Sequence, residues 1–183
     1  MPPEPAGTAS VPETGRRPRP SSDRLDDSIV LESLERHPML SASISKDKSI
    51  EELEGRRWPA PPEGSTSLVR GVHALRRRAI EDLSVEDLRR LIGQDVGLQW
   101  LLPVALDLFR ATAPQEAETG WFDDDLLSAV LTRNADTWRS APRLARHLNE
   151  TVGMLTDLSP HLREEVRAFR SASSDALQGR TGP

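Results

Sequence analysis

The sequence contains no cysteine among its 183 residues. This absence excludes disulfides, zinc-thiolate sites and thiol nucleophiles together. No uninterrupted apolar stretch approaches the roughly 20 residues that a membrane span needs. The amino terminus, MPPEPAGTAS, also lacks the basic start and apolar core of a secretory signal. These absences predict a cytoplasmic protein that does not enter a membrane.

Apolar residues are scarce as well. They make up 36% of the chain, against about 45 to 50% in typical globular domains. From Met1 to Asp47 the sequence is rich in Pro, Ser, Arg and Glu, with a single apolar island, SIVLESL. Such a segment cannot bury enough apolar surface to offset the entropy of ordering it. We therefore expect residues 1–47 to be a disordered extension, dispensable if Met39 is an alternative start.

Helix signals begin at Ser49. In SIEELEG, Ser49 and Glu52 have the spacing of a capping box and Gly55 stands where a helix ends. The proline-rich RRWPAPPEGS that follows excludes helix. A second cap is predicted at Ser84, with Asp87 three residues later. Apolar residues at helical spacing predict the remaining helices, and the expected inward-facing residues are Leu68, Val72, Leu75, Leu88, Leu91, Ile92, Leu98, Leu101, Leu102, Ala105, Phe109, Leu126, Leu127, Val130, Leu131, Leu144, Leu148, Val152 and Leu155.

The pattern predicts an all-α fold, because no alternating strand pattern competes with it. We expect a single compact domain of about five or six helices over residues 48–158, preceded by the disordered extension. A weak helix and a frayed tail are expected over residues 159–183.

The most apolar segment, LRRLIGQDVGLQWLLPVAL, is interrupted by Gly93, Gly97 and Pro103. In a helix interior glycine costs about 1 kcal/mol relative to alanine and proline about 3 kcal/mol. The interruptions therefore indicate two buried helices that meet at a tight corner, GQDVG, with Pro103 either kinking the second helix or beginning it. We expect Gly93→Val to destabilise the fold and Gln94 to hydrogen-bond the orphan backbone groups of the corner.

No catalytic constellation is visible. His37, His73, His147 and His161 have no partners at ligand spacing, and the common hydrolase, zinc-protease and nucleotide-binding motifs are missing. Consecutive helical residues point about 100° apart, so the triplet 123–125 of aspartates cannot converge on a metal ion without acids from elsewhere. A small metal-dependent hydrolase is the weakest hypothesis, and we expect no catalytic residue, metal or cofactor.

Charge is distributed unevenly along a chain of net charge −5. Residues 56–90 hold eight basic and five acidic residues, a net of +3, whereas residues 91–136 hold two basic and eight acidic residues, a net of −6. Acidic side chains beside aromatic ones suit a basic protein partner, because aromatics are enriched at interface hot spots and charge steers encounter. The predicted binding residues are Glu116, Glu118, Trp121, Phe122, Asp123, Asp124 and Asp125. A core position for Trp121 is the open alternative.

Several segments carry a family resemblance. They are SIEELEG, W-x-x-P-P from Trp58 to Pro62, SLVRGVHALRR, LSVEDLRRLIGQDVGLQWLLPVAL, and WFDDDLLSAVL with Trp138 downstream. Together, from Ser49 to about Leu148, they resemble the immunity proteins of bacterial contact-dependent growth inhibition systems. The resemblance implies a non-enzymatic cytoplasmic protein that binds and neutralises a cognate toxin domain, with neither nucleic acid nor membrane as a partner. It leaves the oligomeric state open.

Many such toxins are nucleases with basic active sites, which an acidic partner can cover in place of the substrate. On this hypothesis, reversing the three aspartates at 123–125 to lysine abolishes inhibition. The alternative is an α-helical adaptor or regulator whose basic helix, Arg70 to Arg78, contacts a protein or nucleic acid. The sequence gives that alternative little support, because it depends on one arginine triplet in a protein that is acidic overall.

Overall fold

The computed structural model describes residues 40–119 and 124–178, and every element in these ranges is helical. Six of the nine α-helices have at least seven residues, which confirms the predicted all-α compact domain; the other helices are too short for periodicity to reveal. The elements are α2 (Ile50–Glu54), α3 (Ser67–Leu75), the 3-10 helix η1 (Ile80–Asp82), α4 (Val85–Gly93), α5 (Leu98–Thr119), α6 (Asp124–Leu131), α7 (Ala135–Ser140), α8 (Pro142–Val152), α9 (Pro160–Ala172) and α10 (Ser174–Leu177).

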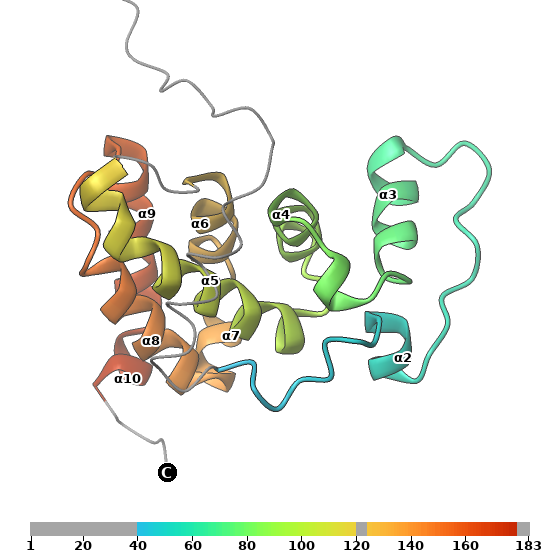
Figure 1. The fold of residues 1–183 in the computed structure, drawn as a ribbon, viewed down its shortest axis with the longest axis horizontal. Coiled ribbons are helices and arrows are strands. Elements are labelled where there is room, and N and C mark those ends of the chain that lie inside the picture. The colour runs from blue at the N-terminus through green and yellow to red at the C-terminus, as the bar shows by residue number, and fades with distance from the viewer. Residues whose placement is uncertain (1–39, 120–123, 179–183) are drawn as a thin grey trace, which may run out of the picture.

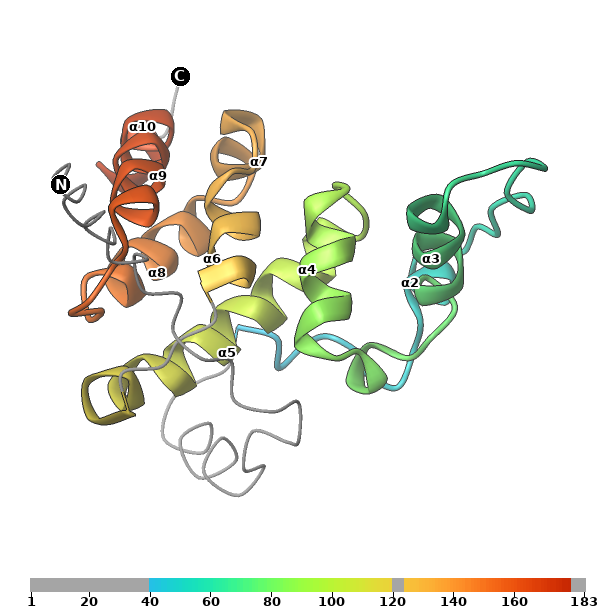
Figure 2. The same cartoon turned by 90° about the horizontal axis from the view of Figure 1, so that it is seen from above.

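Helix α5 runs through the middle of the molecule. Helices α2 and α3 lie at one end, α8, α9 and α10 lie at the other, and α4 and α6 lie between them (Figure 1). Figure 2 shows the same order from above. Helix α5 packs directly against α4, α6 and α8, so it connects the two ends of the fold.

The side chains of α5 are buried around most of its circumference. Leu101, Leu102, Pro103 and Ala111 point in directions about 80 to 100° apart around the helix axis and are all buried. A helix that is apolar on nearly all sides has to be covered on all sides, and burying one large apolar side chain contributes about 1.5 to 3 kcal/mol.

Pro103 lies within α5, which begins at Leu98 and continues to Thr119. The alternative in which Pro103 starts the helix is therefore wrong. The helix keeps the proline inside its second turn at the cost of one backbone donor, and the Pro103 side chain is itself buried.

Both predicted helix caps are confirmed. Ser49 and Glu52 form a reciprocal capping box at α2, which ends at Gly55 with a left-handed φ of 62°. Ser84 and Asp87 form a second box at α4. The backbone N–H and the hydroxyl of Ser49 both donate hydrogen bonds to the Glu52 carboxylate. These bonds, the backbone one more than the hydroxyl one, hold the pKa of the Glu52 carboxyl below its usual value.

The tight corner between α4 and α5 depends on Gly97. Its φ is +65°, and a Cβ added to it would lie 2.8 Å from Cδ1 of the buried Ile50. Asp95 is the other residue of the corner with a positive φ, 55°. The structural role expected of Gly93 is not supported, because its φ is ordinary and an added Cβ would meet nothing within 4 Å.

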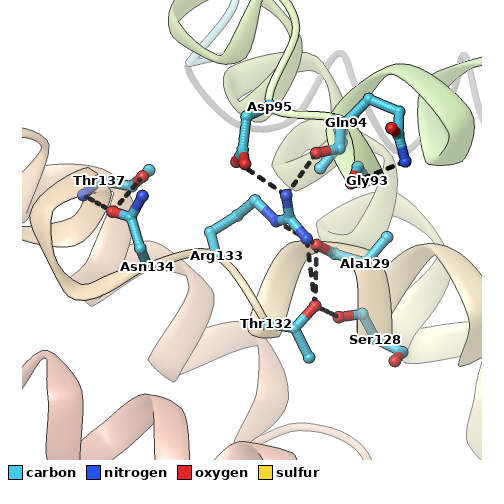
Figure 3. A network of polar contacts seen from close by, with 10 residues as sticks. Gly93, Gln94, Asp95, Ser128, Ala129, Thr132, Arg133, Asn134 and Thr137 are labelled. Atoms are coloured by element: carbon cyan, nitrogen blue, oxygen red, sulfur yellow. Dashed lines mark hydrogen bonds and ion pairs between the residues drawn. The ribbon is translucent and has the colours of Figure 1, made fainter.

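A single arginine ties the corner to α6. The Nη1 of Arg133 donates to the carbonyl oxygen of Ile92 and to Oδ1 of Asp95, both at 2.8 Å, and its Nε donates to the carbonyl oxygen of Ala129 at 2.8 Å (Figure 3). The expected capping role of Gln94 is reduced to one bond from its amide to the carbonyl oxygen of Gly93, at 3.3 Å. Arg133 therefore adds a charged donor to the carbonyl of Ile92, which also accepts from the backbone N–H of Asp95 at 3.0 Å.

The chain is already structured ahead of residue 48, the predicted start of the domain. Asp107 of α5 accepts hydrogen bonds from the N–H of Leu40 at 2.8 Å, and from the N–H and hydroxyl of Ser41 at 2.9 and 2.6 Å. Ser41 and Asp107 are both buried. The rest of the predicted extension, residues 1–39, lies outside the described residues.

The segment after Ser159 also joins the core. Leu162, Val166 and Phe169 of α9 are at most 4% exposed, and the ring of Phe169 packs edge-on against Trp138 with centroids 5.1 Å apart. Most predicted inward-facing residues are buried or half-buried, but Leu68 in the first turn of α3 is 41% exposed, so its predicted core position is wrong.

Two alanine variants test the role of Gly97 in the corner between α4 and α5. We expect Gly97→Ala to lower the free energy of unfolding by about 2 kcal/mol or more, because it combines a left-handed backbone with overpacking against Ile50. Gly93→Ala should be neutral or stabilising by up to about 1 kcal/mol. Denaturant titration of both variants measures the difference, and equal losses would contradict the assigned role of Gly97.

The hydrogen bonds of Arg133 can be tested with a second pair of variants. Arg133→Met should cost about 1 to 3 kcal/mol, because it removes the hydrogen bonds of a largely buried guanidinium to the carbonyls of Ile92 and Ala129 and to the carboxylate of Asp95. The matched control is Arg139→Met, which removes an exposed arginine paired with Asp136 and should cost less than about 0.5 kcal/mol. Thermal melts compare the two, and a loss in the control as large as that of Arg133→Met would count against the tie.

Candidate functional site

Of the seven predicted binding residues, the structure describes the side chains of two. Asp124 and Asp125 occupy the first turn of α6 and are exposed. Carboxylates are favoured there because the amino terminus of a helix carries partial positive charge. Glu116 and Glu118 lie in the last turns of α5, but their side chains, and the whole of Trp121, Phe122 and Asp123, lie outside the described residues.

Other acids in the block 91–136 serve the fold. Asp107 is buried against the chain at Leu40 and Ser41. Asp95 binds Arg133, and Asp136 binds Arg139 one helical turn away. The buried Asp107 therefore adds nothing to the acidic surface of this block, which includes the adjacent exposed aspartates at the start of α6.

The arginine triplet 76–78 is engaged within the protein. Arg76 is 1% exposed, forms an ion pair with Glu54, and places its guanidinium 3.7 Å from the centroid of the Trp58 ring. This stacking combines a cation–π contact with a charge pair. It also holds the proline-rich loop that contains Trp58 against α3.

The neighbours of Arg76 bind carboxylates too. Arg78 lies 2.9 Å from Asp87 and Arg77 lies 3.5 Å from Glu51. On α4, hydrogen bonds from Arg89 lower the pKa of the Glu86 carboxyl. A phosphate-binding surface would need positive side chains that are available to the phosphate. In this protein these arginines instead form ion pairs within the fold.

The described histidines do not assemble into a reactive or metal-binding group. His73 packs edge-on against Trp58, with centroids 5.2 Å apart, the Nε2 of His147 lies 2.5 Å from Arg110, and His161 contacts Glu165. Among the described residues, no three histidine, aspartate or glutamate side chains come together as a set that could hold a metal ion.

One surface feature was missed by the sequence analysis. A groove with a cavity of about 620 Å³ lies between the end of α8, the loop 153–159 and α9. Its apolar lining includes Val152, Leu155, Leu158 and Val166, and its basic lining is Arg163, Arg167 and Arg170. We call it the α8–α9 groove. The spacing of the three arginines, i, i+4 and i+7, is a signal that places them on one side of a helix.

Membrane insertion was tested on the same residues. Within 40–119 and 124–178, no helix combines the length and the apolar character that crossing a bilayer requires.

Comparison with known proteins identifies the family. A family model described as CDI immunity proteins matches residues 52–148, which is 97 of the 183 residues. No curated protein and no solved structure matches the chain. The match covers α3 to α7, most of α8 and the corner at Gly97, and it ends before the residues that line the α8–α9 groove. The chain belongs to the CDI immunity proteins, non-enzymatic inhibitors that neutralise the cognate toxin domains of contact-dependent growth inhibition systems.

Proposed function

We propose that this chain binds and neutralises the toxin domain of its own CDI system in the cytoplasm, and that the acidic start of α6 meets a basic surface of that toxin. The binding surface comprises Glu116, Glu118, Trp121, Phe122, Asp123, Asp124 and Asp125. Membership of the family supports the first part of the proposal. The second part rests on one observation: the aspartates at 124 and 125 are adjacent and both exposed in the first turn of α6.

Electrostatics favour this surface for a partner that acts on nucleic acid. A nuclease presents positive charge where the phosphate backbone of its substrate binds. An acidic patch accelerates encounter with such a surface and competes with the substrate for it. A nucleic-acid partner for this chain fits less well, because Arg76, Arg77 and Arg78 are already paired with carboxylates.

The test is coexpression with the toxin domain encoded beside this chain, with host survival and recovery of the complex as readouts. We expect Asp124→Lys combined with Asp125→Lys to weaken toxin binding by about tenfold or more, mainly through slower and more salt-dependent association. Asp124→Asn with Asp125→Asn should have a smaller effect, because asparagine removes the charge without reversing it. Surface plasmon resonance at two salt concentrations measures both.

The matched control is Glu63→Lys combined with Glu81→Lys. Both glutamates are exposed and lie in the half of the chain that carries α2 and α3, so the control changes the net charge equally at a distant surface. It should leave toxin binding and host survival unchanged. If the control weakens binding as much as the aspartate reversals do, or if those reversals have no effect in proteins with unchanged melting temperatures, the acidic start of α6 is not the binding surface.

A further inference from the structure

The α8–α9 groove combines an apolar floor with a basic rim. Val152 and Val166 are buried at its base, and Leu155 and Leu158 are half-buried beside them. The neighbouring Met154 is 44% exposed, and methionine adapts its shape to varied apolar partners. The groove therefore offers apolar surface to an extended or helical peptide segment.

The rim of the groove is positive. Arg163, Arg167 and Arg170 are exposed, and none of the residues that line the groove is acidic. Arg170 donates to Oδ1 of Asn149 at 2.8 Å. Glu165 of the same helix is directed elsewhere, because it accepts a hydrogen bond from Ser128 of α6 and contacts His161. The complementary ligand is a segment with an apolar centre and acidic flanks.

One segment of this chain outside the described residues has that composition. Residues 23–35, DRLDDSIVLESLE, contain five acidic residues and one basic residue, a net charge of −4, around five aliphatic side chains. The segment and the groove both lie outside the region that matches the family, residues 52–148.

The anchor of this segment lies on the side of α5 that leads to the groove. Leu40 is held by Asp107, the next turn of α5 carries Arg110, and Arg110 contacts His147 of α8. From His147 to the start of the groove at Val152 is about 8 Å along the helix. The six peptide units between Leu34 and Leu40 extend over up to about 20 Å, which is enough to follow this route.

We propose that residues 23–35 dock in the α8–α9 groove of their own chain, with the aliphatic residues on the apolar floor and the acidic residues against the arginines. A polyanion such as nucleic acid is a poorer occupant, because phosphate leaves the apolar floor uncovered. Docking in the same chain also gains from the high effective concentration that a short tether provides. The inference does not depend on the identity or the binding surface of the toxin.

The test uses disulfide trapping in the full chain. Because the protein contains no cysteine, Ser33→Cys combined with Met154→Cys creates one cysteine pair, between the segment and the groove. Under mild oxidation we expect an intramolecular disulfide to form. Adding Arg163→Glu and Arg167→Glu should slow its formation by about tenfold. Adding Arg56→Glu and Arg70→Glu, an equal charge change at exposed arginines away from the groove, should not.

Salt provides a readout that needs no change in the groove. Raising the ionic strength from 0.01 to 1 M shortens the screening length from about 30 to about 3 Å, so it should slow trapping in the parent cysteine pair. This decides the question even if the groove variant fails to fold.

Three outcomes would overturn the proposal. The first is equal trapping rates in the parent pair, the groove variant and the control at every ionic strength. The second is a predominance of disulfides between molecules, which would make a second copy the occupant. The third is loss of toxin binding in the groove variant with unchanged trapping, which would assign the groove to the toxin.

Discussion

The structure depends on the need to cover α5 on nearly all sides. Leu101, Leu102, Pro103 and Ala111 point in different directions around the helix and are all buried. Helices α4, α6 and α8 supply the cover, and the chain turns sharply at Gly97 between α4 and α5 (Figure 2). Ile50, packed against the Cα of Gly97, brings α2 into the same core. The fold is therefore organised around one central helix.

Many charged side chains of this protein hold the fold together. Arg133 and Asp107 each connect segments distant in sequence through bonds to backbone groups, and Arg76 is buried by an aromatic ring and a carboxylate. Proteins of one family that face different toxins need a common scaffold with a variable surface. The engaged charges suit the scaffold, whereas the start of α6 and the α8–α9 groove suit recognition.

Local features of the fold were predictable from the sequence. Contacts between residues far apart in the sequence were not. The capping boxes at Ser49 and Ser84 follow from residues three positions apart, and the apolar face of α6 follows from helical periodicity. The bond from Ser41 to Asp107 spans 66 residues and that from Arg133 to Ile92 spans 41, so no spacing rule reveals them. The same limit made the acidic block look more exposed than it is. Predicting the groove requires knowing how α8 and α9 pack.

Residues 40–119 and 124–178 fold as one unit around α5. Native-state hydrogen exchange tests this claim most directly, because it measures the opening free energy of each amide. We predict that the amides of Ile92 in α4, Phe109 in α5 and Val166 in α9 exchange only through global unfolding, with one shared free energy equal to that from denaturant titration. Exchange of Val166 at a clearly lower free energy than Phe109, with α4 and α5 still protected, would show that the carboxy-terminal helices form a separate unit and would contradict the account.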